Sequence, residues 1–377
     1  MYWMVGRNLL IQKLKQYNKR FVWFICLLLT TSLMAQSKLP TVNHQLQFLK
    51  GIDSTWKENP VKNGQYVNHE FPYLHAFKDI WKWKRMTNPY QEIKKKDTTR
   101  LPLFDGALAE IQSGKDGVFW LGHATFFIRV KGITFITDPV LGKASGFMKR
   151  FSQLPVSLDK LPNIDYILLS HDHRDHCDKN SLKKLKKHSP NAVYLTGLNM
   201  NKVIGSFGIR SEIQCAGWYQ VYQLDSSRLK ISFLPTRHWS KRGPFDTNQH
   251  LWGSFMIEID GMVIYFGGDS GYGSHYKEYS QLFPQIDIAI IGIGAYEPEW
   301  FMEQNHSSPA KGFQAFNDLN AKYLIPMHYG TFDLSDEPIC YPAEVLEKVA
   351  SEQQKAQRVL MRPLGYNLMN DMQLKSH

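Results

Sequence analysis

Four residues of types that bind metals lie close together in the chain: His171, His173, Asp175 and His176. They directly follow the apolar run 166–169, which is typical of a short buried strand. A tight loop there can direct His171 and His173 at one cation, and Asp175 and His176 at a second. Imidazoles and a carboxylate suit zinc, and a pair of zinc ions can generate hydroxide at neutral pH. The alternative is a solvated polar turn, so the question is whether later residues complete a site.

Three later segments also place a metal-binding residue after an apolar run. These residues are His238, Asp269 and His328. Each of them alone is a weak indication, since a lone histidine after a strand is more often a core or surface residue. Together with the first loop they make seven candidate ligands, and ligand-bearing loops at strand ends are where open α/β sheets place their sites. The set therefore predicts a two-metal centre.

Several segments around these residues resemble the metallo-β-lactamase superfamily, and most closely its N-acyl-phosphatidylethanolamine-hydrolysing phospholipase D branch. The resemblance is carried by Trp120-Leu121-Gly122-His123-Ala124-Thr125, Thr137-Asp138-Pro139, Arg237-His238-Trp239-Ser240, Gly268-Asp269-Ser270-Gly271-Tyr272, Gly294-Ala295-Tyr296-Glu297-Pro298 and His328-Tyr329-Gly330-Thr331-Phe332. It extends from about residue 115 to about residue 345. Gly273-Ser274-His275 has no counterpart that we can assign, so His275 receives no role.

The resemblance implies an α/β fold, the four-layer αββα sandwich, with two Zn²⁺ per chain. In that family pattern, His171, His173 and His238 hold one zinc ion, Asp175, His176 and His328 hold the other, and Asp269 bridges them. Catalytic roles fall on Asp175, Asp269 and His306. His306 would assist the leaving group or position the phosphate, although it also fits a surface histidine. Asn305 and Tyr296 are expected to contact the substrate.

The expected reaction is hydrolysis of a phosphodiester by a metal-bridging hydroxide, with an N-acyl-phosphatidylethanolamine-like lipid as substrate. The nearest alternative keeps the metals and changes the bond, as in a lactonase or another ester or amide hydrolase. A non-catalytic binding protein is the third interpretation, and the complete ligand set disfavours it.

The first 35 residues differ in composition from the rest. Five positive charges, Arg7, Lys13, Lys15, Lys19 and Arg20, precede the largely apolar run 21–34, and Ala35 follows. This order is typical of a secretory signal peptide, with an uncleaved anchor as the alternative. We therefore expect an exported protein, periplasmic or membrane-associated. The expected divisions are a leader at 1–35, an irregular lead-in that wraps the core at 36–110, and the hydrolase domain at 111–377.

Without the leader, the net charge falls from +11 to +6. The remaining excess is concentrated at residues 82–85, 94–96 and 183–187, and each of these runs alone also fits a solvated face. Basic residues beside aromatic ones suit an anionic surface. The expected partners are a phospholipid or other phosphodiester substrate and a membrane surface, and the chain could form a homodimer. We expect no nucleic acid partner, because the chain has no long basic arm or aromatic stacking series.

Cysteine usage adds one alternative. The chain after the leader keeps Cys177, Cys215 and Cys340, an odd number that cannot form a complete disulfide framework. Cys177 adjoins the ligand loop and could be a thiolate ligand. A small packed residue is the favoured interpretation, because four ligands already serve that loop.

Strands and helices must position these residues. Apolar runs predict strands at 118–122, 125–130, 133–137, 166–169, 192–195, 221–224, 229–234, 256–259, 262–266, 287–293 and 323–326. Helices are expected at 77–86, 180–188, 199–207, 309–319 and 343–353. Strands followed by helices, repeated roughly twice, match the two-sheet fold that the resemblance implies.

Overall fold

The computed structural model describes residues 38–70, 77–146 and 148–373. The chain divides into two units, Met1–Leu39 and Pro40–His377, and every described helix and strand belongs to the second. The expected leader at 1–35 lies outside the described residues. Within those residues, no helix is both long and apolar enough to cross a membrane.

One sheet has six strands in the order β4–β5–β6–β7–β8–β9. These are β4 (Gly117–Gly122), β5 (Thr125–Val130), β6 (Ile133–Thr137), β7 (Tyr166–Leu169), β8 (Val193–Gly197) and β9 (Ile213–Ala216). The pairs from β6 to β9 are parallel, whereas β4–β5 and β5–β6 are antiparallel. Every residue of β4 and β5 is buried, as expected for strands that are covered on both faces.

The second sheet has seven strands in the order β1–β10–β11–β12–β13–β14–β15. These are β1 (Gln47–Phe48), β10 (Gln220–Val221), β11 (Leu229–Leu234), β12 (Ser254–Ile259), β13 (Met262–Phe266), β14 (Ile288–Gly292) and β15 (Tyr323–Met327). The pairs β13–β14 and β14–β15 are parallel and the other pairs are antiparallel. Asp260 and Gly261 form the tight turn between β12 and β13, both at positive φ.

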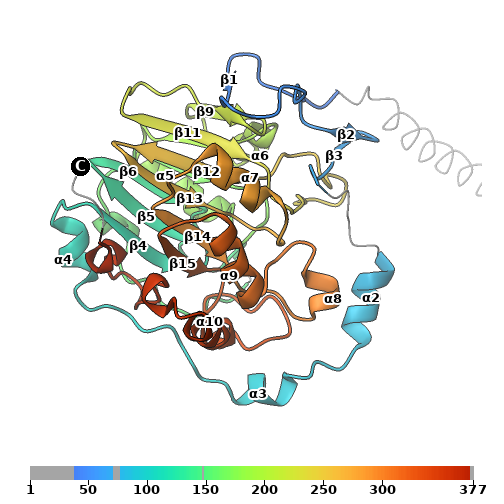
Figure 1. The fold of residues 1–377 in the computed structure, drawn as a ribbon, viewed down its shortest axis with the longest axis vertical. Helices are drawn as coiled ribbons and strands as arrows, with labels where there is room; N and C mark the ends of the chain where they lie inside the picture. Colours follow the sequence, from blue (N-terminus) through green and yellow to red (C-terminus); the bar gives the residue numbers. More distant parts are fainter. Residues whose placement is uncertain (1–37, 71–76, 147, 374–377) are drawn as a thin grey trace, which may run out of the picture. The chain divides into compact units, whose positions relative to one another are not determined.

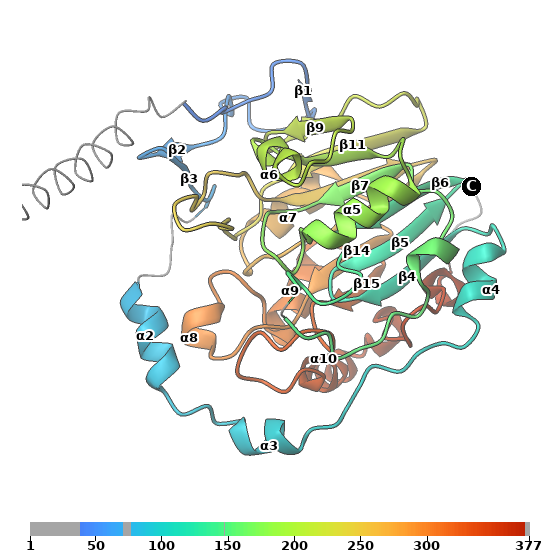
Figure 2. The same cartoon turned by 180° about the vertical axis from the view of Figure 1, so that it is seen from behind.

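Helices cover the outer face of each sheet. Leu182 and Leu185 of α5 (Lys179–His188) join the apolar core under the six-stranded sheet, and α6 (Met200–Ser206) packs on β8 and β9 (Figure 2). On the other side, α9 (Pro309–Asp318) packs on β14 and β15, with α7 (His275–Leu282) and α10 (Tyr341–Glu352) against it (Figure 1). The layers are therefore helix, sheet, sheet, helix, which confirms the αββα prediction.

Local sequence explains where these helices begin. Asp178 caps α5 by accepting a hydrogen bond from the backbone N–H of Ser181. Ser308 caps α9 in the same way, and Pro309 occupies the first turn, where no backbone donor is needed. The lysines of α5 point away from its buried leucines, so this helix has the amphipathic pattern that its sequence predicts.

The lead-in is less irregular than expected. It contains β1, the small hairpin of β2 (Val61–Lys62) and β3 (Gln65–Tyr66), α2 (Phe77–Arg85), α3 (Gln91–Lys96) and α4 (Ala107–Gln112). β1 extends the seven-stranded sheet through the pairs Gln47 with Val221 and Phe48 with Gln220. The expected border between residues 110 and 111 falls inside α4. The division into lead-in and hydrolase domain stays a prediction.

The strand predicted at 221–224 was too long, and several short elements were missed. β10 ends at Val221, because the backbone N–H and C=O of Gln223 pair with the side chain of Gln214 instead of a neighbouring strand. The missed elements include β9, α3, α4, α7 and α8 (Glu299–Met302). In the described part of the chain, short 3₁₀ helices lie at Leu158–Lys160, Ala356–Arg358 and Leu368–Asp371.

Strand directions bring the predicted ligands to one edge. In the six-stranded sheet β4, β6 and β7 run the same way, and in the other sheet β11, β13, β14 and β15 do. Candidate ligands follow the carboxyl ends of β7, β11, β13 and β15. Within each sheet, the strands that lead to candidate ligands therefore run in one direction and end at the same edge.

Candidate metal centre

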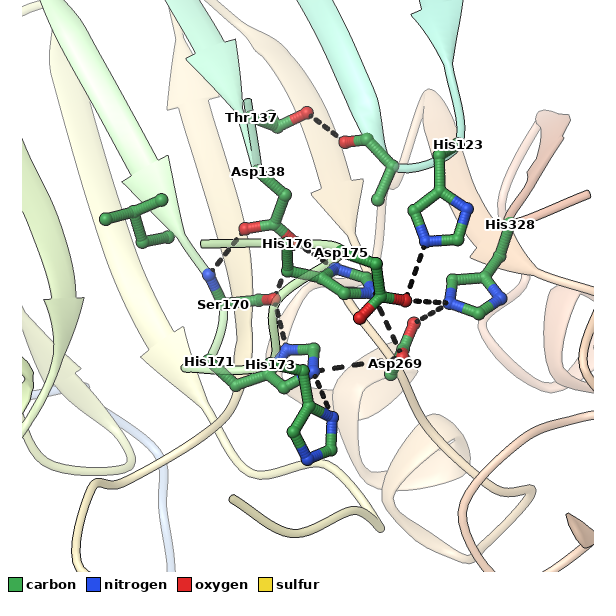
Figure 3. A network of polar contacts seen from close by, with 12 residues as sticks. His123, Thr137, Asp138, Ser170, His171, His173, Asp175, His176, Asp269 and His328 are labelled. Carbon is green, nitrogen blue, oxygen red and sulfur yellow. Dashed lines mark hydrogen bonds and ion pairs between the residues drawn. The ribbon is translucent and has the colours of Figure 1, made fainter. Parts of the chain in front are cut away.

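The structure brings all seven predicted ligands together at these strand ends (Figure 3 shows six of them). The loop after β7 carries His171, His173, Asp175 and His176, and the ends of β11, β13 and β15 are followed by His238, Asp269 and His328. Among the groups whose possible ligand atoms lie within 4.8 Å of one another, the two largest are His171, His173, His238 and Asp269, and His123, Asp175, His176 and His328. We call His171, His173 and His238 the first half-site, and Asp175, His176 and His328 the second half-site.

Ring nitrogens converge in the first half-site. His173 Nδ1 lies 2.9 Å from His171 Nε2 and 3.1 Å from His238 Nε2. His238 Nδ1 lies 3.0 Å from the carbonyl oxygen of Asn305, which can only accept, so the proton of a neutral His238 sits on Nδ1. Its Nε2 is then an unprotonated acceptor that faces the other two rings. A shared cation satisfies such a convergence of lone pairs.

The same reasoning fixes His171. Ser170 Oγ donates to Asp138 Oδ2 at 2.6 Å, so it accepts from His171 Nδ1 at 2.8 Å. The proton of His171 is therefore on Nδ1, and its Nε2 is free to bind a metal. Asp138 itself follows β6, the strand next to β7, and it is fully buried.

The second half-site combines one carboxylate with two histidines. His176 Nδ1 lies 2.7 Å from Asp138 Oδ2, which places the proton of a neutral His176 on Nδ1 and leaves Nε2 available to a metal. That Nε2 is 3.6 Å from Asp175 Oδ2, and His328 Nε2 is 3.7 Å from the same oxygen. Asp138 thus supports ligands of both half-sites, His176 directly and His171 through Ser170.

Asp269 lies between the half-sites. Its Oδ2 is 3.8 Å from His171 Nε2 and 3.7 Å from His238 Nε2, and 3.1 Å from His176 Nε2. Its Oδ1 is 3.2 Å from His328 Nε2. Gly268, at φ +55°, lets the backbone pass so close to Ser170 that a Cβ would lie 2.7 Å from the Ser170 Cβ. One carboxylate can therefore contact cations on both sides.

The donor set fits bound cations. Three candidate ligand atoms that face the centre are buried without a hydrogen-bond partner: His176 Nε2, Asp269 Oδ1 and His328 Nε2. Leaving such atoms unsatisfied costs about 1–3 kcal/mol each. Metal coordination removes that cost, and imidazole with carboxylate is a ligand chemistry that zinc uses.

Electrostatics favour positive charge at the centre. Burial opposes ionisation of Asp269, but His176 and His328 outweigh it and hold the pKa of Asp269 well below its usual range. Burial also lowers the pKa of His328, yet Asp269 and Asp175 raise it to about 9. Positive charge, whether of a proton or a metal, is thus stabilised at His328. By contrast, burial holds the pKa of His171 and of His238 well below the ordinary value, so both stay neutral.

The three other predicted site residues lie beside the cluster. His306 Nδ1 is 3.8 Å from Asp269 Oδ2, and burial lowers the pKa of His306 to about 4. His306 and Tyr296 line a cavity of about 190 Å³ that also includes Arg237, Tyr272 and Lys311. Asn305 is buried, and its carbonyl holds His238. Asn305 therefore lies behind the candidate ligand His238.

Two residues of the centre were not predicted as site residues: His123 and Asp138. Each directly follows the carboxyl end of a buried strand, β4 and β6 respectively, just as the predicted ligands do. That position was the observation that could have identified them. Cys177, the alternative ligand, packs in the core, and burial raises the pKa of its thiol to about 12. Its sulfur stays a neutral thiol there.

Comparison with known proteins agrees with this geometry. Residues 134–329, slightly more than half of the chain, match a family model described as the β-lactamase superfamily domain. The chain belongs to the metallo-β-lactamase superfamily. It is a metal-dependent hydrolase of that superfamily, near the N-acyl-phosphatidylethanolamine-hydrolysing phospholipase D branch.

Two curated relatives carry the branch assignment. N-acyl-phosphatidylethanolamine-hydrolyzing phospholipase D 1 of Caenorhabditis elegans is 28% identical over 298 residues, which cover 73% of this chain and 83% of that protein. The mitochondrial enzyme of the same description from Saccharomyces cerevisiae is 31% identical over 280 residues, 69% of this chain and 57% of that protein. The chain thus spans little more than half of the yeast relative.

Solved structures share the fold. Igni18, a metallo hydrolase from the archaeon Ignicoccus hospitalis, aligns with a TM-score of 0.52 at 21% identity and covers 66% of this chain and 96% of its own. An isothiocyanate hydrolase from Delia radicum gut bacteria aligns with a TM-score of 0.55 at 16% identity over 66% of this chain and 97% of its own. At these identities the likeness concerns the fold alone.

Proposed function

We propose that this hydrolase is a two-zinc phosphodiesterase of phospholipase D type that acts on N-acyl-phosphatidylethanolamine-like lipids. The observation that carries the proposal is the position of Asp269 between two clusters of histidine ring nitrogens. A two-metal centre suits a phosphodiester, because it stabilises both the attacking and the leaving oxygen. The two phospholipase D relatives support the choice of lipid.

The ligand assignment follows from the half-sites. The first half-site would hold one zinc ion, the second half-site the other, and Asp269 would contact both. Bound there, zinc ions supply Lewis acidity toward phosphate oxygens and lower the pKa of a coordinated water. Asp138 and Ser170 keep the protons of His171 and His176 on Nδ1, so that each Nε2 faces the centre.

Residues of the cavity beside the centre would bind the substrate. His306 is neutral at pH 7, so it carries one N–H that can donate to a phosphate oxygen or to the leaving group. Arg237 is held in place by the carbonyl of Tyr272 and the side chain of Gln304, and Lys311 lies over the ring of Tyr272. Two cations beside His306 favour an anionic diester, and we propose that the polar headgroup region binds in this cavity.

The test uses the full chain, purified without chelator. Metal content is measured first, and hydrolysis is then followed with N-acyl-phosphatidylethanolamine, bis-p-nitrophenyl phosphate, a lactone panel and a chromogenic cephalosporin. We expect two zinc ions per chain, and phosphatidic acid as a product of the lipid. Two ions with lactone turnover and no diester turnover would establish the lactonase alternative instead, and a chain that binds no metal would contradict the mechanism.

For the membrane contact, we propose the surface formed by α2 and α8. Ile80 and Trp81 of α2 are 40% and 49% exposed, and Trp300 of α8 is 36% exposed. The α2 basic residues lie among them, and Lys82 Nζ is 4.1 Å from the centre of the Trp300 ring. Exposed indoles beside lysines suit the interface of an anionic bilayer. Because α8 leads within four residues to His306, this contact would bring lipid close to the centre.

The chain offers a matched control for this surface. α5 is even more basic than α2, but its leucines are buried, so it exposes charge without large apolar side chains. Binding of the full chain to phosphatidylcholine vesicles with and without phosphatidylglycerol should fall for Lys82→Glu/Lys84→Glu. It should fall much less for Lys183→Glu/Lys184→Glu. If both double variants lowered vesicle binding equally, binding would depend on overall positive charge and not on the surface of α2 and α8.

Export and self-association are part of the same proposal. N-terminal sequencing of protein recovered from soluble and membrane fractions distinguishes a cleaved leader from an anchor. Light scattering on the purified chain decides between a monomer and the proposed homodimer.

A further inference from the structure

His123 lies at the turn between β4 and β5, where the six-stranded sheet reaches the centre. The backbone there is unusual, with Gly122 at φ +107° and His123 at φ +54°. A residue with a side chain rarely adopts positive φ without support. The support is visible: the N–H of His123 donates to Thr331 Oγ1 at 2.9 Å, and its carbonyl accepts from Trp120 Nε1 at 2.8 Å.

The ring of His123 is enclosed on several sides. Its side chain is 1% exposed, and its ring centre lies 4.0 Å from that of His328 and 5.0 Å from that of Phe332. Its Nε2 lies 3.0 Å from Asp175 Oδ2. The backbone and the packing together leave this ring directed at one oxygen of a candidate ligand, as Figure 3 shows.

The proton of this contact can be placed from chemistry alone. An ionised carboxylate only accepts hydrogen bonds, so a neutral His123 must carry its proton on Nε2. The oxygen that receives it, Asp175 Oδ2, is also the Asp175 oxygen that faces His176 Nε2 and His328 Nε2, at 3.6 and 3.7 Å. His123 therefore acts on the atom that faces the second half-site.

We propose that His123 is a positioning residue that fixes the Asp175 carboxylate within the second half-site through an Nε2–H···Oδ2 hydrogen bond. This inference rests on the metal ligation proposed above, but it does not depend on the lipid substrate. Ligating carboxylates are commonly fixed by a hydrogen bond from a neighbouring group, and loss of that group weakens metal binding about 10- to 100-fold. His123 donates that bond to Asp175, just as Asp138 orients His176 by accepting a hydrogen bond from its Nδ1.

The test compares His123→Phe, which keeps a ring and loses the donor, with His123→Gln, which keeps a donor. Zinc affinity is measured by competition with a chromophoric chelator in the full chain, and the absorption spectrum of the cobalt-substituted protein is recorded. For the phenylalanine variant we expect one of the two ions to bind about 10- to 100-fold more weakly, with the other unchanged. The glutamine variant should recover most of this loss and should keep the cobalt spectrum of the wild type.

Controls separate this role from packing and from ligation. Phe332→Leu alters the packing around the His123 ring without touching the hydrogen bond, so it should leave both affinities within about threefold of the wild type. Unchanged affinities in His123→Phe would overturn the inference. So would a glutamine variant that fails to recover and shows an altered cobalt spectrum, because His123 would then be a ligand. A wild-type chain without two ions would contradict the ligand assignment as well.

Discussion

The first half-site presents three imidazoles, whereas the second presents two imidazoles and the carboxylate of Asp175. The rings of the first are oriented through Ser170 and the carbonyl of Asn305. The second is backed by the carboxylate of Asp138 and by His123. The second therefore has more negative charge of its own, and burial leaves two of the first half-site's rings neutral. Because charge count governs the attraction for a divalent cation, we expect the first half-site to release its ion first.

Substitution of the shared residue should have the largest effect. Asp269→Ala removes the one carboxylate that lies between both half-sites, so both should lose affinity and activity should fall by at least about 10³-fold. Metal analysis and diester turnover on the same sample check this. An Asp269→Ala protein of verified low metal content that still turns over substrate would contradict the assignment.

Single ligand substitutions should separate the half-sites. His238→Ala should lower the metal content to about one ion per chain and leave the second half-site filled, and His328→Ala should do the reverse. Activity should fall roughly 10²-fold or more in each, because a two-metal reaction needs both ions. Stepwise chelation of the wild type should remove one ion well before the other. Simultaneous loss of both ions would show that the two halves do not differ in affinity.

Asp138→Asn should weaken metal binding at both half-sites, because Asp138 orients ligands of both through hydrogen bonds. The amide cannot accept equally well from His176, Ser170 Oγ and the Ser170 backbone, so ring orientation is lost on both sides. We expect affinity losses of about 10- to 100-fold for the two ions. Asp178→Asn is a suitable control, because Asp178 is also buried but caps α5 instead of supporting a ligand. Equal losses in both variants would indicate a general folding defect.

A smaller and one-sided effect is expected from Asn68. Its amide donates to the carbonyl of His238 at 2.9 Å and accepts from the N–H of His238 at 3.1 Å. Asn68→Ala should lower the free energy of unfolding by about 1–3 kcal/mol and weaken only the first half-site. Asn59→Ala is the matched control, because Asn59 is buried and clamps backbone at Thr41 and Trp218. Asn59→Ala should lower the free energy of unfolding by a similar amount and leave the metal affinity of both half-sites unchanged.

The strands that end at the centre were predictable because their residues are apolar throughout. Burial on both faces imposes that pattern, and it located the ends of β7, β13 and β15 within a residue or two. The seven candidate ligands followed from those ends and from the family resemblance. Their coming together in space agrees with the sequence, and their metal-binding roles remain part of the proposal.

The supporting contacts were not predictable in the same way. Asn68 meets His238 across 170 residues of sequence, and β1 pairs with β10 across a similar span. Nothing in the local sequence of residues 36–70 specifies those partners. His123 directly follows the end of a buried strand, as the candidate ligands do. Because seven candidate ligands already completed a two-metal site, there was no reason to assign His123 to it. Short helices such as α3 and α8 lack the length for a periodic pattern.

The ligands of each half-site come from both sheets, and this has a consequence for the order of synthesis. The loop after β7 leaves the ribosome early, but the first half-site lacks His238 until β11 has been made, and Asp269 follows only after β13. The second half-site waits for His328, close to the last strand. Domains of a growing chain fold as they emerge, so the nascent protein cannot hold two ions until its final sheet is almost complete. Binding of the proposed ions would thus be one of the last steps of folding after synthesis, and it would join the two sheets.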